Sequence, residues 1–401
     1  MFLKFFALTM SLFVIGTGEL LPGGVIEDLS AGLGVSIPTA GLVITAYAAT
    51  VVFGGPLVTG LTTRMSRRSL LLALMVTATV GNTIAAFAPN YTVLVVGRII
   101  AALSHGTFAA ASFVVAASLV PPEKAGSAVS KVLLGFNLAS VLGVPLGTLI
   151  GQQFGWQAPF RTTAALSLVC VVLLAALIPG GAEGTPTSVR DELRVFTKKE
   201  IRIGVLTTAL ATGGFFTVVT YMVPLATQVG DFPEASVPVM LVVYGIGSIL
   251  GNWIGGRLAD RALLPTLAGT LAALTATSAL FWLAAPVTAL AWAFFFLFAV
   301  ATFAILPALQ GRVLSAAAEA PTLAVTVNVS ALQVGATLGS WYGGRVIDTF
   351  DVRAITLACA FLVLLATALG TRSWLGSRTP NAVAAATPAP ATTEAVEAGT
   401  A

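Results

Sequence analysis

The sequence contains very little charge. Only 9% of its 401 residues are Asp, Glu, Lys or Arg and 57% are hydrophobic, a composition that excludes an ordinary soluble domain. A helix needs about 20 apolar residues to cross the hydrocarbon of a bilayer. Uncharged stretches of that length or longer include 29–63, 69–97, 132–160, 203–230 and 262–311. The chain is therefore predicted to be an all-α membrane protein.

Metal-binding and catalytic residue types are also scarce. The single histidine excludes a multi-histidine metal site, and Cys170 and Cys359 lack the spacing of a metal or redox motif, so both are expected to be buried free thiols. No phosphate-binding loop, nucleophile constellation or carboxylate pair is present. We therefore expect neither an enzyme nor a bound cofactor or metal.

Twelve apolar stretches have the length of a membrane-spanning helix. The first continues beyond Lys4 without the small-residue cleavage site of a signal peptide, so it is interpreted as a retained span. The predicted spans are 5–26, 38–61, 69–89, 92–119, 127–151, 160–178, 203–228, 235–256, 264–285, 287–311, 321–344 and 353–374.

Lys and Arg are unevenly distributed among the loops. With the N-terminus in the cytoplasm, sixteen of the twenty basic residues fall in cytoplasmic segments or at their edges; the exceptions are Arg98, Arg161, Arg345 and Arg353. The positive-inside rule then places both termini in the cytoplasm. The basic residues thus orient the chain in the membrane and show no footprint for nucleic acid.

The spans divide six and six around a polar segment. We predict an N-terminal bundle over 1–179, a cytoplasmic linker over 180–202, a C-terminal bundle over 203–376 and a disordered cytoplasmic tail over 377–401. The mixed charges of the linker suit a solvated segment or a short surface helix.

The two halves carry similar polar and glycine spacings. Asn137, Gly143 and Gly147 in the fifth span correspond to Gln333, Gly339 and Gly343 in the eleventh, at a constant offset of 196 residues. Two pseudo-symmetric six-helix bundles that face each other are the architecture of a transporter that rocks around a central site.

One acidic residue, Glu19, lies within the first predicted span. A carboxylate near the membrane centre costs roughly 2.5–3.5 kcal/mol on insertion scales, so it persists facing a cavity, paired or protonated. Arg98 and His105 lie two turns apart on one face of the fourth span, at depths that bracket Glu19. We predict that these three residues couple transport to protons. The alternatives are a sealed neutral carboxyl, an arginine that only compensates charge and a histidine that is only hydrogen-bonded.

Several polar and aromatic residues are candidates for a central cavity. Asn137 and Gln333 occupy spans that carry the repeat, and aromatic rings can stack on a flat, lipophilic compound. Any single one could instead pack in the core or tie helices together. The predicted cavity residues are Tyr47, Phe108, Asn137, Phe216, Tyr221 and Gln333.

The fifth span holds a bare stripe of small residues. Gly143, Gly147 and Gly151 recur every four residues, which lets another helix approach closely, and Pro145 removes a backbone donor and bends the helix. Ordinary small-residue packing is the alternative interpretation.

Four segments together resemble the major facilitator superfamily, over nearly the whole chain. They read GTGELLPGGVIEDLSAGLGVSIPTAG (16–41), GRIIAALSHGTFAAA (97–111), GFNLASVLGVPLGTLIGQQFGW (135–156) and GGRLAD (255–260). The chain is most similar to twelve-span drug:proton antiporters, in the branch of chloramphenicol and arabinose exporters. The resemblance implies a multi-pass protein of the bacterial inner membrane that acts as a monomer.

The resemblance also suggests roles for these motifs. The fifth-span motif resembles the antiporter signature, expected where the halves meet on the periplasmic side, and Arg98 matches an arginine associated with proton transfer. The cytoplasmic loop signature is present imperfectly, because Thr63 stands where Asp is usual, and its second-half copy is more complete. The matching loop residues are Arg64, Arg67, Arg68, Gly256, Asp260 and Arg261.

The predicted function is export of a small lipophilic compound, drug-like or a sugar, in exchange for protons. Glu19 suits a neutral or cationic compound, whereas Arg98 could admit an anion. The alternatives are an importer or facilitator of a sugar or metabolite and, more remotely, a membrane sensor that does not transport. The replacement of Asp by Thr63 is the one feature that favours a sensor.

Overall fold

Every regular element in the described part of the chain is a helix. The computed structural model describes residues 2–62, 64–121, 125–179, 199–316 and 321–377. Ten of the helices in these ranges are long and apolar enough to cross a membrane, and two further helices of 29 and 23 residues, α15 (Pro321–Thr349) and α16 (Ile355–Ser377), complete a set of twelve. The predicted tail, apart from Ser377, and the predicted linker up to residue 198 lie outside these ranges.

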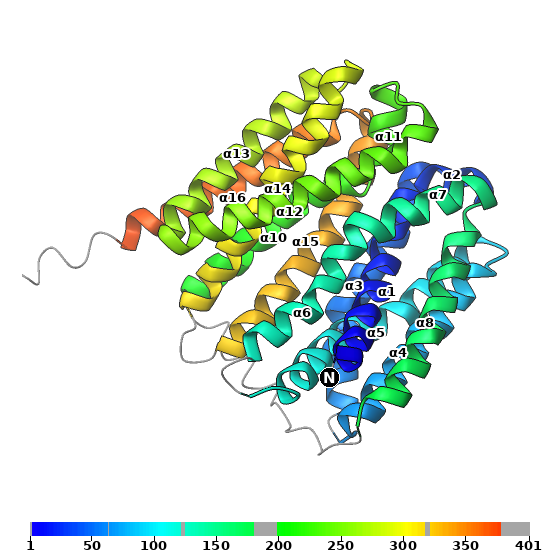
Figure 1. Cartoon of the computed structure of the whole chain (residues 1–401). Coiled ribbons are helices and arrows are strands. Elements are labelled where there is room, and N and C mark those ends of the chain that lie inside the picture. The colour runs from blue at the N-terminus through cyan, green and yellow to red at the C-terminus, as the bar shows by residue number, and fades with distance from the viewer. Residues whose placement is uncertain (1, 63, 122–124, 180–198, 317–320, 378–401) are drawn as a thin grey trace, which may run out of the picture.

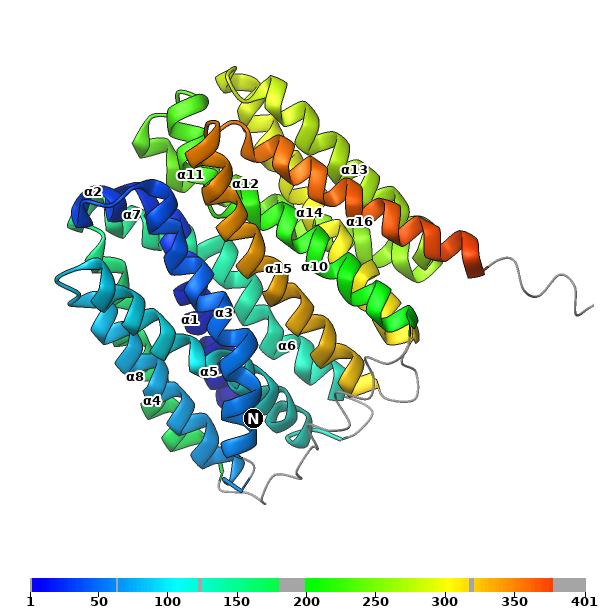
Figure 2. The same ribbon diagram turned by 180° about the vertical axis from the view of Figure 1, so that it is seen from behind.

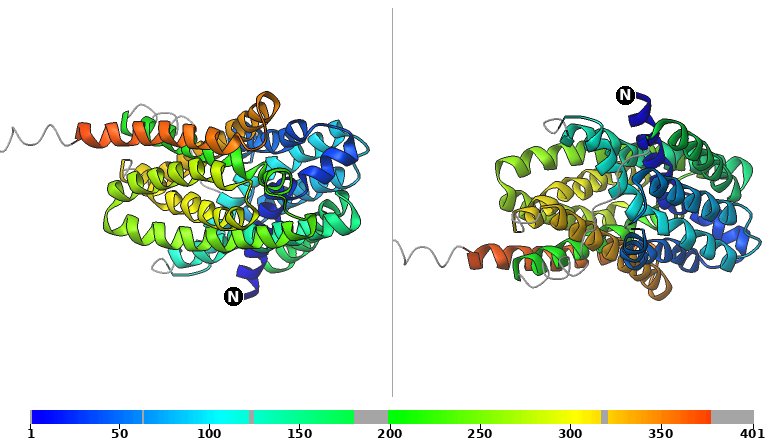
Figure 3. Two further views of the ribbon diagram at one scale, coloured as in Figure 1. Left: turned by 90° about the horizontal axis from the view of Figure 1, so that it is seen from above. Right: turned by 90° about the horizontal axis from the view of Figure 1, so that it is seen from below.

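The helices form two bundles that lie side by side (Figures 1 and 2). The first half contains α1 (Phe2–Gly24), α2 (Ile26–Leu33), α3 (Ile37–Leu61), α4 (Arg67–Ala86), α5 (Tyr91–Ser118), α6 (Ala125–Leu138), the π-helix η2 (Ala139–Gly143), α7 (Val144–Phe154) and α8 (Gln157–Leu177). The second half contains α10 (Lys199–Val219), α11 (Met222–Pro224), the π-helix η3 (Leu225–Val229), the 3₁₀ turn η4 (Glu234–Ser236), α12 (Val237–Arg261), α13 (Leu263–Ala284), α14 (Thr288–Ala316), α15 and α16. The end views in Figure 3 show the blue-to-teal half beside the green-to-red half.

Polar caps set the starts of three long helices. The side chains of Ser36, Ser66 and Asn90 each accept a hydrogen bond from the backbone N–H three residues later, at the first turns of α3, α4 and α5. Such caps satisfy N–H groups that have no partner within the helix. Gly34, with φ of 64°, ends α2 in the left-handed conformation that glycine adopts most readily.

Two local breaks differ from the predicted spans. A separate short helix, α2, follows the first span, and the predicted seventh span (203–228) is interrupted after Val219. The interruption places Tyr221 between the halves, and Pro224, which has no N–H to donate, precedes the π-helix η3. The uninterrupted apolar sequence hides this break, which explains why one continuous helix was predicted.

The glycine repeat appears as matching helix contacts in the two halves. Gly143 packs against Thr17 and Gly147 against Leu21, both on α1. In the second half Gly339 packs against Gly213, and Gly343 against Thr217, both on α10. Each of these pairs is related to its counterpart by the same 196-residue offset. The sequence repeat therefore corresponds to equivalent helix contacts in the two halves. The bare stripe of the fifth span therefore faces a helix of its own half. The opposite half approaches the same segment at Val141, which packs against Gly245 on α12.

The two halves are joined at the end of the molecule that carries α2, α11 and η4, here named the α2 end. Oε1 of Glu27 on α2 accepts hydrogen bonds from Oγ1 of Thr227 at 2.8 Å and from Nε2 of Gln228 at 2.9 Å, both on η3. Nε2 of Gln152 on α7 donates to the carbonyl oxygen of Glu234 at 2.6 Å. These cross-half hydrogen bonds close the α2 end.

Tyr221 completes this closure. Its side chain is fully buried and its hydroxyl donates to the carbonyl oxygen of Ser340 at 3.0 Å. Gly41 on α3 and Gly344 on α15 have no side chains, and the ring of Tyr221 fills the space where a Cβ would lie. The phenol thus seals the contact between α3 and α15.

Both cysteines are buried free thiols, as predicted. Cys170 lies in the core of the first half, and Cys359 lies 3.2 Å from the hydroxyl of Ser278 in the core of the second.

Candidate functional site

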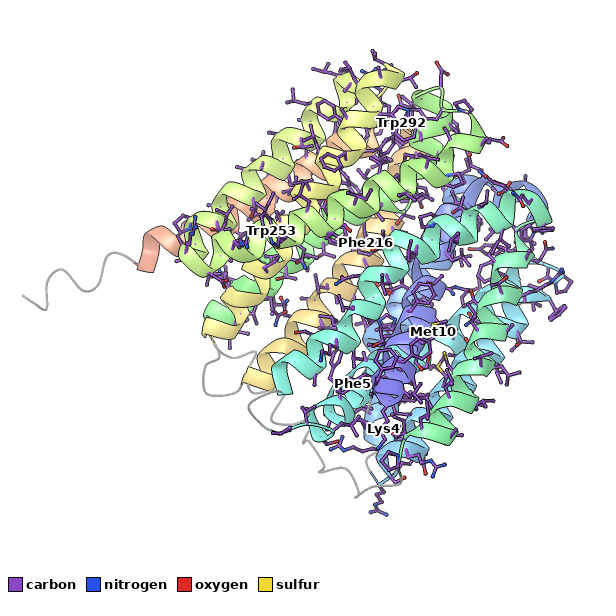
Figure 4. The ribbon with its side chains drawn as sticks, in the orientation of Figure 1. Lys4, Phe5, Met10, Phe216, Trp253 and Trp292 are labelled. Atoms are coloured by element: carbon purple, nitrogen blue, oxygen red, sulfur yellow. The ribbon has the colours of Figure 1, made fainter. Side chains whose placement is uncertain are left out.

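A cavity lies between the two halves, beneath the closed α2 end. It has about 350 Å³ of empty space, part of which is open to solvent, and its walls come from α1 and α3 of the first half and from α10, Thr220 and α15 of the second. The lining is apolar except for one carboxylate and the polar tips of a tyrosine and a threonine. The lining residues are Glu19, Leu20, Gly23, Ile44, Tyr47, Ala48, Phe216, Val219, Thr220 and Ala336. Phe216, labelled in Figure 4, belongs to the wall contributed by the second half.

The Glu19 carboxylate receives contacts from both halves. Its Oε2 lies 3.6 Å from Nδ1 of His105 on α5, an ion pair when the imidazole is protonated. Its Oε1 accepts a hydrogen bond of 3.2 Å from Nε2 of Gln333 on α15. Nδ1 of His105 also lies 3.2 Å from the hydroxyl of Tyr47. The carboxylate therefore sits where a histidine and an amide from opposite halves meet.

Arg98 lies behind this group and is completely buried. Its Nη2 donates to the backbone carbonyl of Glu19 at 3.3 Å, not to the carboxylate, and its guanidinium lies 4.3 Å from the centre of the Tyr47 ring. Nε and Nη1 have no hydrogen-bond partner in the described part of the chain. The two residues whose depths bracket Glu19 thus contact it differently: His105 approaches the carboxylate, and Arg98 donates to the backbone carbonyl.

Three predicted cavity residues lie elsewhere in the structure. Phe108 is buried within the core of the first half, and Tyr221 is part of the seal at the α2 end. Asn137 is exposed on α6. None of them is among the residues that line the cavity. Tyr47 and Phe216 do line it, and Gln333 reaches Glu19 at its edge.

The predicted antiporter motif packs directly on the helix that carries Glu19. Thr17, against which Gly143 packs, is two residues before the acid on α1, and Gly151 packs farther along α1's continuation against Val25. The π-helix η2 ends two residues before Pro145, and the N–H of Val144 donates five residues back to the carbonyl oxygen of Ala139. Such π-turns recur at functional sites. A shift of this segment would therefore move the acid directly.

Comparison with known proteins identifies the family. The model of the Major Facilitator Superfamily matches residues 8–340. The chain belongs to the major facilitator superfamily. It is 40% identical over 348 residues to the inner membrane transport protein YdhP of Escherichia coli (strain K12), covering 85% of this chain and 88% of that protein. It is 34% identical over 344 residues to a chloramphenicol resistance protein of Streptomyces lividans, with 84% and 87% covered.

A solved structure agrees with this fold. The crystal structure of a bacterial homologue of the human lysosomal transporter Spinster, in an inward-facing, occupied conformation, superposes with a TM-score of 0.78. The alignment covers 94% of this chain and 98% of that one at 15% sequence identity. The protein is thus a multi-pass membrane transporter with the major facilitator fold.

Only some residues of the superfamily's loop signatures make contacts with other parts of the protein. Arg68 donates from Nη2 to the carbonyl oxygen of Ala175 on α8, whereas Arg64 is exposed and Thr63 lies outside the described residues. In the second half Gly256 faces open space. Arg67 and Arg261 form no ion pair with Asp260 within the described side chains. The described residues of the two loops therefore form no ion pair with each other in this conformation.

Sequence reasoning missed the contacts that cross between the halves. Gln333 was predicted to line a cavity, but its pairing with Glu19, 314 residues away, has no local signal. Glu27 lies in the segment that carries the family resemblance, directly after the first span, and its acidic side chain is the only sequence hint of the contact with Thr227 and Gln228.

Proposed function

We propose that this superfamily member exports a small, largely apolar compound in exchange for protons. The observation that carries the proposal is the position of Glu19: a single carboxylate lies in the wall of an otherwise apolar cavity between the halves, within reach of His105. An ionisable group in that place can bind a proton from one side and release it to the other. Coupling of one proton per cycle is the simplest expectation.

We further propose that the α2 end faces the periplasm and that both termini lie in the cytoplasm. The N-terminus and Lys4 lie towards the opposite end (Figures 1 and 4). Helix α3 starts next to α2 and α10 leads into α11, so the far end of α3, which precedes Arg64 and Arg68, and the start of α10, which holds Arg202, lie towards that end as well. The positive-inside rule assigns such an end to the cytoplasm. The closed α2 end then corresponds to the inward-facing state, in a bacterial inner membrane.

The proposed cycle alternates access by rocking residues 1–179 against residues 203–376. A proton from outside neutralises Glu19 in the outward-facing state and is carried inward. The compound enters from the cytoplasm, occupies the cavity and favours release of that proton. His105 exchanges the proton with Glu19, and Arg98 fixes the backbone that presents the acid.

The lining indicates the kind of compound. Eight of the ten lining residues are apolar or aromatic, and the aromatic residues Tyr47 and Phe216 come from opposite halves. Arg98 is shielded from the cavity by Tyr47, so the exposed charge is negative. A neutral or cationic drug-like molecule fits better than an anion. Because one relative is a chloramphenicol resistance protein, chloramphenicol belongs in any panel of compounds.

The test is proton release in everted membrane vesicles with a panel of lipophilic antibiotics and sugars. At least one compound should dissipate an imposed pH gradient with the wild-type protein, and Glu19→Gln should abolish this because the amide cannot exchange a proton. Asp231→Asn, which changes an exposed acid outside the cavity lining, is the matched control and should behave as wild type. The proposal fails if no compound dissipates the gradient through the wild-type protein.

A facilitator or importer would respond differently to the same variant. After Glu19→Gln it would keep moving its compound down a gradient and would show no uphill extrusion to lose. Retained downhill flux with no proton release in the wild type would therefore favour facilitation. Counterflow of a bound compound in proteoliposomes would dismiss a sensor that does not transport.

A further inference from the structure

The side-chain amide of Gln333 links the predicted proton-carrying residue to the opposite half of the protein. Glu19 lies on α1 in the first half and Gln333 on α15 in the second, and Nε2 donates to Oε1 at 3.2 Å. The other cross-half hydrogen bonds described above lie at the α2 end and involve neither residue. Ala336, one turn along α15, lines the same cavity as Glu19. This bond thus crosses the interface at the cavity itself.

The chemistry of the bond depends on the protonation state of Glu19. A carboxylate only accepts hydrogen bonds, and a hydrogen bond to an ionised acceptor is roughly twice as strong as one between neutral groups. Protonation removes that charge. The amide oxygen of Gln333 is buried and has no hydrogen-bond partner among the described residues, so the present orientation of the amide suits the deprotonated acid.

A proton:compound antiporter must prevent its empty, deprotonated form from changing its facing direction. If the empty, deprotonated protein could return from the inward-facing to the outward-facing state, protons would flow in without any compound flowing out. Separating the two halves at the depth of the cavity breaks the hydrogen bond between Gln333 and Glu19. The bond is strongest in the empty, deprotonated protein, is weakened by a proton, and is replaced when a compound takes the carboxylate.

We propose that Gln333 is a positioning residue that prevents this leak, by holding the empty, deprotonated transporter closed at the α2 end until the exported compound displaces its amide from Glu19. The proposal rests on the proton-coupled export described above. In this proposal, the amide of Gln333 ensures that protons flow inward only when the compound flows outward.

The test measures proton entry into proteoliposomes under an imposed pH gradient, with potassium and valinomycin to prevent charge build-up and with no compound present. Gln333→Met keeps the length and volume of the side chain but cannot donate a hydrogen bond. It should admit protons about tenfold faster than wild type, the ratio expected when one charge-assisted hydrogen bond is lost. Gln333→Asn, whose amide is one methylene too short, should leak similarly and serves if the Met variant does not fold.

Two controls separate this role from simple loosening of the closed end. Gln152→Met removes another cross-half amide hydrogen bond, to the neutral carbonyl of Glu234, without touching Glu19, and should leak much less than Gln333→Met. Combining Gln333→Met with Glu19→Gln should abolish the leak, since no proton carrier remains. A leak of equal size in Gln152→Met, or a leak that survives Glu19→Gln, would overturn the proposal.

The outcomes also distinguish this inference from the proposed function. If the wild type exchanges a compound for protons and Gln333→Met does not leak, the inference fails and the function stands. If Gln333→Met shows a Glu19-dependent leak but no compound drives proton release through the wild type, export is the part that fails.

Discussion

Arg98 is the residue whose position is hardest to explain by stability. Its guanidinium is fully buried, and two of its three nitrogen atoms lack a hydrogen-bond partner in the described part of the chain. Removing a charged group from water costs several kcal/mol unless its hydrogen bonds are all satisfied. The ring of Tyr47 at 4.3 Å and a single bond to the Glu19 carbonyl offset this cost only in part. We infer that the residue is retained for transport.

Arg98→Met should therefore separate stability from function. We expect the variant to fold with a stability equal to or above that of the wild type, because replacing a buried ion pair by apolar residues of similar volume is often neutral or stabilising by about 1–4 kcal/mol. We also expect it to lose proton-coupled transport. Thermal unfolding in detergent and the vesicle assay measure the two effects. Arg161→Met, which removes an exposed arginine near the Phe87 ring, should change neither. A clear loss of stability in Arg98→Met would contradict the interpretation.

The interlocking of α1 with α6, η2 and α7 is the feature that matters at the scale of elements. Gly135 packs against the backbone of α1 at Thr9 and Phe13, and the glycines that follow continue the same contact along the helix. Backbone cannot move aside as a flexible side chain can. The helix that carries Glu19 is thus held against the segment with the π-helix along its whole length, and the two should move as one unit.

Gly135→Ala tests this contact. An added Cβ would collide with the carbonyl of Thr9 and the N–H of Phe13, so we expect a loss of roughly 1–3 kcal/mol of stability from overpacking, with reduced transport. Gly269→Ala on α13 is the matched control. No atom of the described residues lies within 4 Å of its Cβ position, so it should be neutral or stabilising by about 0.4–1 kcal/mol. Similar melting temperatures for both variants would show that the helices separate easily.

Closure of the α2 end is a property of the whole molecule, and Asp28 makes it depend on pH. The pKa of the Asp28 carboxyl is raised by burial first and then by the charges of Glu234 and Glu27. Glu234 belongs to the second half, so its repulsion requires that the halves meet. An acid whose pKa is raised in the closed form binds protons more readily there. Closure is therefore favoured as pH falls through that raised pKa and is opposed by the charged group above it.

Asp28→Asn should favour the closed form and flatten its pH dependence, because the amide carries no charge at any pH. Distances between spin labels at Pro89→Cys and Pro286→Cys, exposed positions in the loops after α4 and α13, report the opening. Asp231→Asn removes the charge of an exposed acid in the second half and should leave the distances and their pH dependence unchanged. If the distances were longer in Asp28→Asn than in the wild type, the predicted effect of the Asp28 charge on closure would have the wrong sign.

The sequence predicted the twelve-helix fold because each crossing requires an apolar run of fixed length, which composition reveals directly. It also brought Glu19 and His105 together, since helical rise converts residue number into depth. It did not predict the break before Tyr221, because the surrounding residues are as apolar as any span. Nor did it predict the pairing of Glu19 with Gln333 or of Glu27 with Thr227, because the relative placement of two bundles depends on all of their packing at once.

The burial of both thiols has a practical consequence for studying motion. Cys170 and Cys359 have no accessible surface, and the sequence contains no other cysteine. A maleimide or spin-label reagent should not react with the native protein, and should label only a cysteine that has been introduced. Rocking of the two halves can then be followed in the natural background, without first replacing residues that support each core.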